Sequence, residues 1–219
     1  EIAVAVIGRP NVGKSSLVNR LVGEDRVVVS EKPGTTRDAI DTPLQYHGHT
    51  LIFVDTAGLR RKGKIDEAVE FYASLRTERA IDRAGVCVLV LDAADGLHTQ
   101  DLKVAAKAWE QGTGLVVAVN KWDLVKKETN TAEEGRKAAV ERAPFLDAVP
   151  FVFISALEGQ RAGKVLEAVL EVAEARRKRV PIGGNVNDDT PDRMRRATSS
   201  RPTLTLRPQS CFTHAWAAV

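Results

Sequence analysis

The 219-residue sequence predicts an α/β fold, in which six strands form a mostly parallel sheet with helices on both faces. Three observations predict this fold. Short apolar runs rich in β-branched residues recur along the chain, segments of helical period separate them, and polar or glycine-containing stretches follow several of the runs directly. Parallel strands need right-handed crossovers, whose helices cover the sheet. Ligands of such sheets bind beyond the carboxyl ends of the strands, where the polar stretches fall.

Six segments are predicted to be strands. Five are continuous apolar runs bounded by turn residues, as expected of strands buried on both faces: Ile2–Ile7, Leu51–Val54, Val86–Leu91, Leu115–Val119 and Phe151–Ile154. The sixth, Thr42–Tyr46, is more polar and joins the run at Leu51 through the turn-like pair His47–Gly48. We therefore expect a hairpin at one edge of the sheet.

The segments between the runs are predicted to be helices. They comprise Lys14–Val22, Asp66–Ile81, Gln100–Glu110, Ala132–Arg142 and Gly163–Lys178. In the last of them, Val165, Val169 and Val172 recur at helical spacing and form an apolar stripe that can pack on the sheet. The fourth is expected to open with a capping box, Thr131–Glu134.

The composition is that of a soluble globular protein, with 43% hydrophobic residues, 28% charged residues and a net charge of +3. No apolar stretch approaches the roughly 20 residues that a membrane span needs, and the first residues carry no signal-peptide pattern. The two cysteines, Cys87 and Cys211, suggest no disulfide framework, so we expect a reducing, cytoplasmic compartment. The chain starts on a predicted strand without Met, which leads us to expect a piece of a longer protein.

The composition changes near Val180. Residues 180–219 hold five Arg and no Lys, four of the nine Pro, and no apolar period. We expect one folded domain over residues 1–179 and an irregular or disordered tail over 180–219.

The first motif lies between the first strand and the first helix. Gly8-x-x-x-x-Gly13-Lys14-Ser15 has the spacing and the context of a phosphate-binding loop, whose glycines let consecutive N–H groups face phosphate oxygens. Lys14 can reach the β- and γ-phosphates, and the Ser15 hydroxyl can ligate Mg²⁺. The predicted nucleotide-binding residues here are Gly8, Arg9, Pro10, Asn11, Val12, Gly13, Lys14, Ser15 and Ser16.

The second motif, Asp55-Thr56-Ala57-Gly58, ends the strand Leu51–Val54. A carboxylate at this point can hold Mg²⁺ through water, and the Gly58 N–H can contact a γ-phosphate. Alternatively, Asp55–Gly58 is an ordinary turn after a strand. The segment lies about forty residues after the first motif, however, and this spacing favours a second phosphate-binding motif. The nucleotide-binding residues predicted here are Asp55, Thr56, Ala57, Gly58 and Leu59.

The third motif, Asn120-Lys121-Trp122-Asp123, identifies the base. The Asp123 carboxylate can accept hydrogen bonds from N1–H and from the exocyclic amine of guanine, whereas adenine lacks both donors in that arrangement. Asn120 can tie this loop to the phosphate-binding loop, and the Lys121 stem can lie over the base. Ser155-Ala156-Leu157, after the last strand, can supply a backbone N–H to guanine O6. A P-loop kinase or ATPase is therefore disfavoured.

In order and spacing these motifs resemble those of GTPases, and in particular of the Era and TrmE type, because Pro33–Asp38 lies where their first switch stands. The resemblance implies a P-loop NTPase G domain. Within this group, Asp55–Lys64 together with Asn120–Asp123 resembles the second G domain of bacterial proteins that carry two tandem G domains and a KH-like domain. Those proteins act in assembly of the large ribosomal subunit.

The resemblance implies further roles for single residues. Thr36 would be the Mg²⁺ ligand of the first switch, beside Ser15 and Asp55, and the predicted catalytic set is Lys14, Thr36 and Gly58. Asn11 stands where TrmE-type domains coordinate K⁺ beside the phosphates, and such an ion can neutralise charge in the transition state. The alternative for Asn11 is a turn residue that tolerates tight backbone geometry.

Leu59 is informative because it is apolar. Switches of the Ras kind place a glutamine there to orient the attacking water. Either hydrolysis is slow, or backbone groups, a rearranged switch or a partner position the water. The first hypothesis is thus a switch that hydrolyses GTP to GDP and phosphate, slowly and with stimulation by K⁺. The alternative is a guanine-nucleotide-dependent ribosome- or RNA-binding module with negligible hydrolysis.

The resemblance also implies partners. The expected partner is the large ribosomal subunit or rRNA, and no membrane or DNA partner is expected. The basic run Arg60–Lys64 is either a solvent-exposed face or a face that contacts RNA. Residues 180–219 do not resemble the KH-like domain that follows in the family. Their composition resembles an out-of-frame reading of a GC-rich gene. If a one-base shift in the nucleotide sequence restored a KH-like reading, this hypothesis would be supported. If no such shift existed, the hypothesis would be contradicted.

Overall fold

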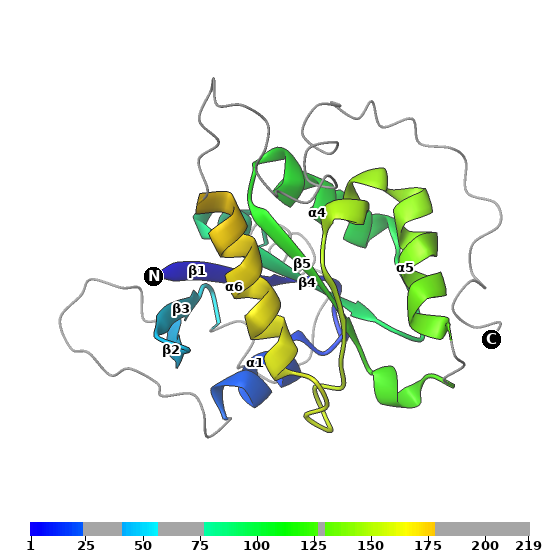
Figure 1. Cartoon of the computed structure of the whole chain (residues 1–219), viewed down its shortest axis with the longest axis horizontal. Coiled ribbons are helices and arrows are strands. Elements are labelled where there is room, and N and C mark those ends of the chain that lie inside the picture. The colour runs from blue at the N-terminus through cyan, green and yellow to red at the C-terminus, as the bar shows by residue number, and fades with distance from the viewer. Residues whose placement is uncertain (24–40, 57–76, 127–129, 178–219) are drawn as a thin grey trace, which may run out of the picture.

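The computed structural model describes residues 1–23, 41–56, 77–126 and 130–177 (Figure 1). Within these residues the strands form one six-stranded sheet in the order β2-β3-β1-β4-β5-β6. Strands β2 and β3 pair antiparallel, and all other neighbours pair parallel. The strands are β1 (Ile2–Ile7), β2 (Thr42–Tyr46), β3 (His49–Phe53), β4 (Val86–Asp92), β5 (Gly114–Asn120) and β6 (Phe151–Phe153).

The helices alternate with the strands, as predicted. They are α1 (Lys14–Val22), α4 (Thr99–Glu110), α5 (Thr131–Arg142) and α6 (Gly163–Arg177), with short 3₁₀ turns η1 (Trp122–Leu124) and η2 (Pro144–Ala148). Residues 77–83 are also helical and form the described end of the predicted helix Asp66–Ile81, whose first part lies outside the described residues. The sheet, its mostly parallel pairing and the edge hairpin are all confirmed.

The predicted capping box is wrong. The N-cap of α5 is Asn130, and Thr131 is already the first helical residue. The Asn130 carbonyl accepts the first bond of the helix from the Glu134 N–H at 3.0 Å, which is the role of the N-cap backbone. The Thr-x-x-Glu pattern thus stands one residue inside the helix, and Asn130 makes no side-chain capping bond.

Strand pleating divides the interior into two cores. Along β1, Val4 and Val6 belong to the cluster under α1 and α6, whereas Ala5 and Ile7 belong to the cluster under α4, α5 and residues 77–83. Both faces of the sheet are therefore covered. In the central strands β4 and β5, every residue is buried. Figure 1 shows α6 and α5 on opposite sides of these central strands.

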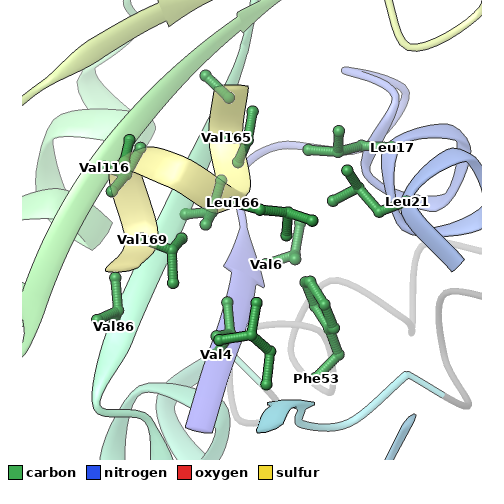
Figure 2. Packing of buried hydrophobic residues seen from close by; sticks show 14 of the residues in the cluster. Val4, Val6, Leu17, Leu21, Phe53, Val86, Val116, Val165, Leu166 and Val169 are labelled. Atoms are coloured by element: carbon green, nitrogen blue, oxygen red, sulfur yellow. The ribbon is translucent and has the colours of Figure 1, made fainter. Parts of the chain in front are cut away.

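The first core shows how closely the helices approach the sheet. Figure 2 shows Leu17 and Leu21 of α1 directed toward Val6 and toward Leu166 of α6. The predicted stripe on α6 is confirmed, because Val165, Val169 and Val172 are all buried in this cluster. A Cβ on Gly114, at the start of β5, would lie 2.6 Å from Val172 Cγ1, so any larger residue there would displace Val172 of α6.

This topology brings the ends of β1, β3, β4 and β5 to one edge of the sheet. Asp92 and Asn120, the last residues of β4 and β5, pair in register. Each of the three numbered motifs and the segment Ser155–Leu157 follows one of these strands or β6, so those of their residues that the structure describes lie at the carboxyl edge. No described helix combines the length and the apolar character that a membrane crossing requires.

Candidate nucleotide-binding site

The loop between β1 and α1 is packed against the ends of two other strands. Three of its residues have left-handed φ angles, which are +135° at Gly8, +63° at Asn11 and +95° at Gly13. A Cβ on Gly8 would lie 2.4 Å from the Val90 carbonyl oxygen, and one on Gly13 would lie 2.1 Å from Asn120 Nδ2. Both glycines of the motif are therefore required by conformation and by space.

Lys14 lies against the backbone of the same loop. Its Nζ donates to the carbonyl oxygens of Gly8 at 2.8 Å and Arg9 at 2.5 Å. Burial lowers the pKa of Lys14 to about 8, and the negative charge of Asp101 acts in the opposite direction. A phosphate near this ammonium would favour its charged form, which is the electrostatic role that the motif assigns to it.

Arg9 fastens the loop to the start of α4. Its Nε donates to Asp101 Oδ2 at 3.0 Å, and a terminal nitrogen contacts Asp95 Oδ2 at 3.4 Å. Asp101 is fully buried, and its Oδ2 also accepts the His98 N–H at 3.0 Å. Among the described residues, Asp101 Oδ1 has no hydrogen-bond partner. Sequence reasoning missed Asp101, which resembles any acidic residue in a first helical turn.

Asn120 joins the phosphate loop to the last loop of the site. Its Nδ2 donates to the Val12 carbonyl at 2.8 Å, and its Oδ1 accepts the Ala156 N–H at 2.9 Å. The side chain is buried, so both bonds are shielded from competing water. The predicted tie between the third motif and the phosphate loop is thus present.

The rest of the third motif is fixed by its own contacts. Lys121 adopts a left-handed φ of +62°, and its Nζ pairs with Asp92 Oδ2 at 2.5 Å. Trp122 is buried, and its backbone N–H donates to the Ile154 carbonyl at 3.0 Å. Its ring centroid lies 4.6 Å from that of Phe153. Trp122 is therefore a packing residue. Asp123 is exposed on the outer side of this anchored turn.

The segment Ser155–Gly159 is held from several sides. The buried Ser155 donates its N–H to the Gln160 carbonyl at 3.0 Å, and its hydroxyl accepts the Glu158 N–H at 3.1 Å. Leu157 is 74% exposed at the tip of this turn.

Arg20 of α1 also contacts this turn, and sequence reasoning did not single it out. Its Nε donates to the Ala156 carbonyl at 3.2 Å, and a terminal nitrogen donates to the Leu157 carbonyl. The signal in the sequence was weak, since Arg20 is one of several polar residues on the exposed side of the helix. An open pocket of about 310 Å³ lies beside it and is lined by Ser16, Asn19, Arg20, Gly23, Ala156 and Leu157.

The described part of the second motif is anchored to the edge hairpin. The Asp55 N–H donates to Asp41 Oδ1 at 3.1 Å, and Arg83 pairs with Asp41 Oδ2 at 2.5 Å. The Thr56 and Thr42 hydroxyls are 2.8 Å apart. Because β3 is the parallel neighbour of β1, Asp55 leaves the sheet beside the phosphate loop.

Several predicted site residues lie outside the described residues. They are Thr36 with the rest of Pro33–Asp38, then Ala57, Gly58 and Leu59, and the basic run Arg60–Lys64. Among the described residues, no three His, Cys, Asp or Glu side chains gather to hold a metal ion. A Ser15 hydroxyl with an Asp55 carboxylate is nevertheless a suitable oxygen donor set for Mg²⁺, which binds through few protein ligands together with phosphates.

Comparison with protein families gives one match that covers more than half of the chain. Residues 3–121 match the family described as 50S ribosome-binding GTPase. The chain belongs to this GTPase family. Its fold is accordingly that of a P-loop GTPase G domain, and the matched residues contain the phosphate loop, Asp55 and Asn120.

Curated relatives of this chain extend the match. GTPase Der of Gemmatimonas aurantiaca is 57% identical over 196 residues, which are 89% of this chain and 45% of that protein. GTPase Der of Caldanaerobacter subterraneus subsp. tengcongensis is 53% identical over 182 residues, 83% of this chain and 42% of that protein. The chain therefore spans less than half the length of these relatives and is similar to a partial G domain of Der.

Solved structures share the fold. Era of Aquifex aeolicus bound to GDP·AlF₄⁻ superposes with a TM-score of 0.60 at 24% identity, over 78% of this chain and 56% of that one. The G domain of the FeoB iron transporter of T. maritima has a TM-score of 0.51 at 25% identity, over 78% of this chain and 98% of that one. The predicted G-domain fold is thus confirmed.

Proposed function

We propose that this G domain binds GTP and GDP with Mg²⁺ and hydrolyses GTP to GDP and phosphate, as a switch in assembly of the large ribosomal subunit. The observation that carries the proposal is the pair of hydrogen bonds of the Asn120 side chain, which donates to the Val12 carbonyl of the phosphate loop and accepts the Ala156 N–H of the last loop. It joins a phosphate-binding element to two loops whose residues suit guanine.

Base choice depends on Asp123, which follows Asn120 in the same anchored turn. An exposed carboxylate at this place can pair with N1–H and the exocyclic amine of guanine, while adenine would leave it without those donors. The aliphatic stem of Lys121 lies over the base in this proposal, because its ammonium is paired with Asp92.

The phosphates bind to the loop N–H groups and to the start of α1, with Lys14 as the cation. Bound Mg²⁺ supplies neutralisation of developing phosphate charge, and Ser15, Asp55 and Thr36 would hold it. Era, which shares this fold, has been solved in complex with MgGDPNP, a nucleotide bound together with this ion. Lys14, Thr36 and Gly58 remain the proposed catalytic set.

Asn11 is the residue proposed for K⁺. It is exposed, and its left-handed backbone is one that Asn tolerates better than most residues. That geometry suits a turn residue as well as a ligand, so an ion-specific measurement has to decide its role.

The partners are proposed from relatives. The matching family is described as ribosome-binding, and an Era structure contains nucleotides 1506–1542 of 16S rRNA. We propose ribosomal RNA or the large subunit as the partner and the cytoplasm as the location. Arg60–Lys64 is the proposed RNA-facing run.

The decisive experiment compares the affinities of GTP, GDP and ATP, and GTP turnover, in KCl and in NaCl. We expect GTP and GDP to bind on the order of 10³-fold more tightly than ATP, and turnover to be slow and faster in KCl. Equal affinity for ATP would instead indicate a P-loop kinase or ATPase. Guanine-specific binding without turnover in either salt would support the binding module in place of an enzyme.

A further inference from the structure

Arg20 holds the turn Ser155–Gly159 through three of its residues. It donates from Nε to the Ala156 carbonyl at 3.2 Å and from a terminal nitrogen to the Leu157 carbonyl. Its guanidinium also lies against Gly159, where φ is +75° and an added Cβ would be 3.3 Å from Arg20 Cζ. A planar guanidinium can make these contacts together because its donors form a rigid fork.

The hydrogen bonds of this turn leave two amides, those of Leu157 and Gly159, without an acceptor among the described residues. The Ser155 N–H is bound by the Gln160 carbonyl, the Ala156 N–H by Asn120 Oδ1, and the Glu158 N–H by Ser155 Oγ. Between them, the Leu157 N–H has no acceptor among the described residues. Of the two amides, that of Leu157 directly follows Ala156, whose N–H is bonded to Asn120 of the third motif, so we expect the Leu157 N–H to be the one that donates to a ligand.

Arg20 fixes the direction of that amide. The Ala156 carbonyl and the Leu157 N–H belong to one peptide unit, and a trans peptide directs these two groups to opposite sides. Holding the carbonyl therefore sets the orientation of the N–H. A charged donor on the carbonyl also polarises the peptide and strengthens its N–H as a donor.

The anchor of Arg20 is rigid. In the same helix, Leu17 and Leu21 are fully buried and point toward Val6 and Leu166 (Figure 2). Arg20 itself is exposed, so its bonds to the turn add to the packing of α1 without being needed for it.

We propose that Arg20 is a positioning residue for guanine specificity, which directs the Leu157 N–H toward O6 of the base. The proposal rests on the guanine-nucleotide binding proposed above. It assigns recognition of O6 to a contact between α1 and the last loop, separately from recognition of N1 and the amine by Asp123.

Three diphosphates test this division of roles. 6-Thio-GDP keeps the N1–H and the amine but replaces O6 by sulfur, which is a weak acceptor. IDP keeps N1–H and O6 but lacks the amine. Kd values are measured against GDP for the full chain and for Arg20→Ala, with ADP as a fourth ligand.

We expect the full chain to prefer GDP over 6-thio-GDP by about 3- to 10-fold, the range of one hydrogen bond. In Arg20→Ala this preference should fall toward one, while the preference for GDP over IDP stays unchanged. Arg20→Lys, which keeps the charge but not the fork, should behave like Arg20→Ala. Arg136→Ala is the matched control, because Arg136 also bonds a backbone carbonyl, that of Asp147 beyond α5.

Other outcomes overturn the proposal. An equal loss of affinity for all guanine-type ligands in Arg20→Ala, or no loss, would show that Arg20 does not act through O6. Recovery of the preference in Arg20→Lys would assign the effect to charge alone. If the unaltered chain bound ADP as well as GDP, the proposed function itself would fail, which is a different result from an unchanged 6-thio-GDP ratio.

Discussion

Lys14 is the titratable residue of the site whose protonation the fold changes most clearly. Burial lowers its pKa from 10.5 to about 8, despite the opposing charge of Asp101. Between these two values the unfolded chain binds a proton that the folded chain lacks, so Lys14 makes the free energy of unfolding rise with pH in this window. Below pH 8 both states are protonated, and the cost of burying the ammonium is fully present.

Nucleotide binding should have the opposite pH dependence. A phosphate beside Lys14 favours the ammonium form, so above pH 8 binding must take up a proton and GDP affinity should fall, by up to about tenfold per pH unit. Titrations from pH 7 to 9.5 measure this. Lys14→Arg is the control, since a guanidinium does not titrate there. An identical slope in both proteins would contradict the assignment to Lys14.

The ion pair between Arg9 and Asp101 predicts a strongly non-additive pair of mutations. Arg9→Ala would leave a fully buried carboxylate without its cation, which costs about 3–5 kcal/mol. Removing both side chains in Arg9→Ala/Asp101→Ala should cost less than the sum of the single changes. Urea unfolding of the four proteins gives the coupling energy. Additive effects would mean that the pair contributes no interaction of its own.

At the scale of elements, the site depends on how closely the β1–α1 loop approaches the end of β5. Gly13 has a φ of +95°, and a Cβ there would lie 2.1 Å from Asn120 Nδ2. Gly112, before β5, has a φ of +69° but meets nothing within 4 Å. Alanine substitution at Gly112 therefore measures the destabilisation from the backbone conformation alone. Substitution at Gly13 adds the destabilisation from the steric contact with Asn120.

Gly112→Ala should destabilise the protein by about 1–2 kcal/mol through conformation alone and leave GDP affinity unchanged. Gly13→Ala should cost about 1–3 kcal/mol more, because it displaces Asn120 from its bond to Val12, and it should greatly weaken GDP binding. Thermal unfolding and GDP titration of both variants test this. Similar losses in the two variants would show that the contact with Asn120 is unimportant.

The elements themselves could be predicted from the sequence to a large extent. Buried strands such as β4 and β5 are short β-branched runs, and the motifs after β1 and β5 are local patterns, so both are visible in one stretch of chain. Asp101 and Arg20 could not be found this way, because their partners, Arg9 and Ala156, are 92 and 136 residues away. The start of α5 was misplaced by one residue since Asn130 and Thr131 are both acceptable caps.

At the scale of the whole molecule, the two cores share one sheet, whose central strands are buried on both faces. Cys87, in β4, is fully buried within the core under α4 and α5, and burial raises the pKa of its thiol to about 12. Because the thiolate is the reactive form, alkylation of Cys87 requires that this core open. The other cysteine, Cys211, lies outside the described residues.

Cys87 should therefore report global unfolding in a Cys211→Ala background. Its alkylation should be slower than that of a free thiol by about the unfolding equilibrium constant, of order 10³ or more. GDP with Mg²⁺ should slow it further in proportion to 1 + [GDP]/Kd. Mass spectrometry of iodoacetamide-treated protein follows the rate. A rate that does not change with GDP or with low urea would indicate a local opening near β4.

Asn120 links the loop that is proposed to bind the phosphates to the loop that is proposed to contact the base. One buried amide touches the loop that suits the phosphates and the loop that suits the base, so ordering either loop also orders the other. Pyrophosphate and guanosine, added as separate molecules, should thus each raise the affinity for the other. An intact guanine nucleotide should then gain affinity from the coupling between its own parts, and a nucleotide with the wrong base should also bind less tightly through its phosphates.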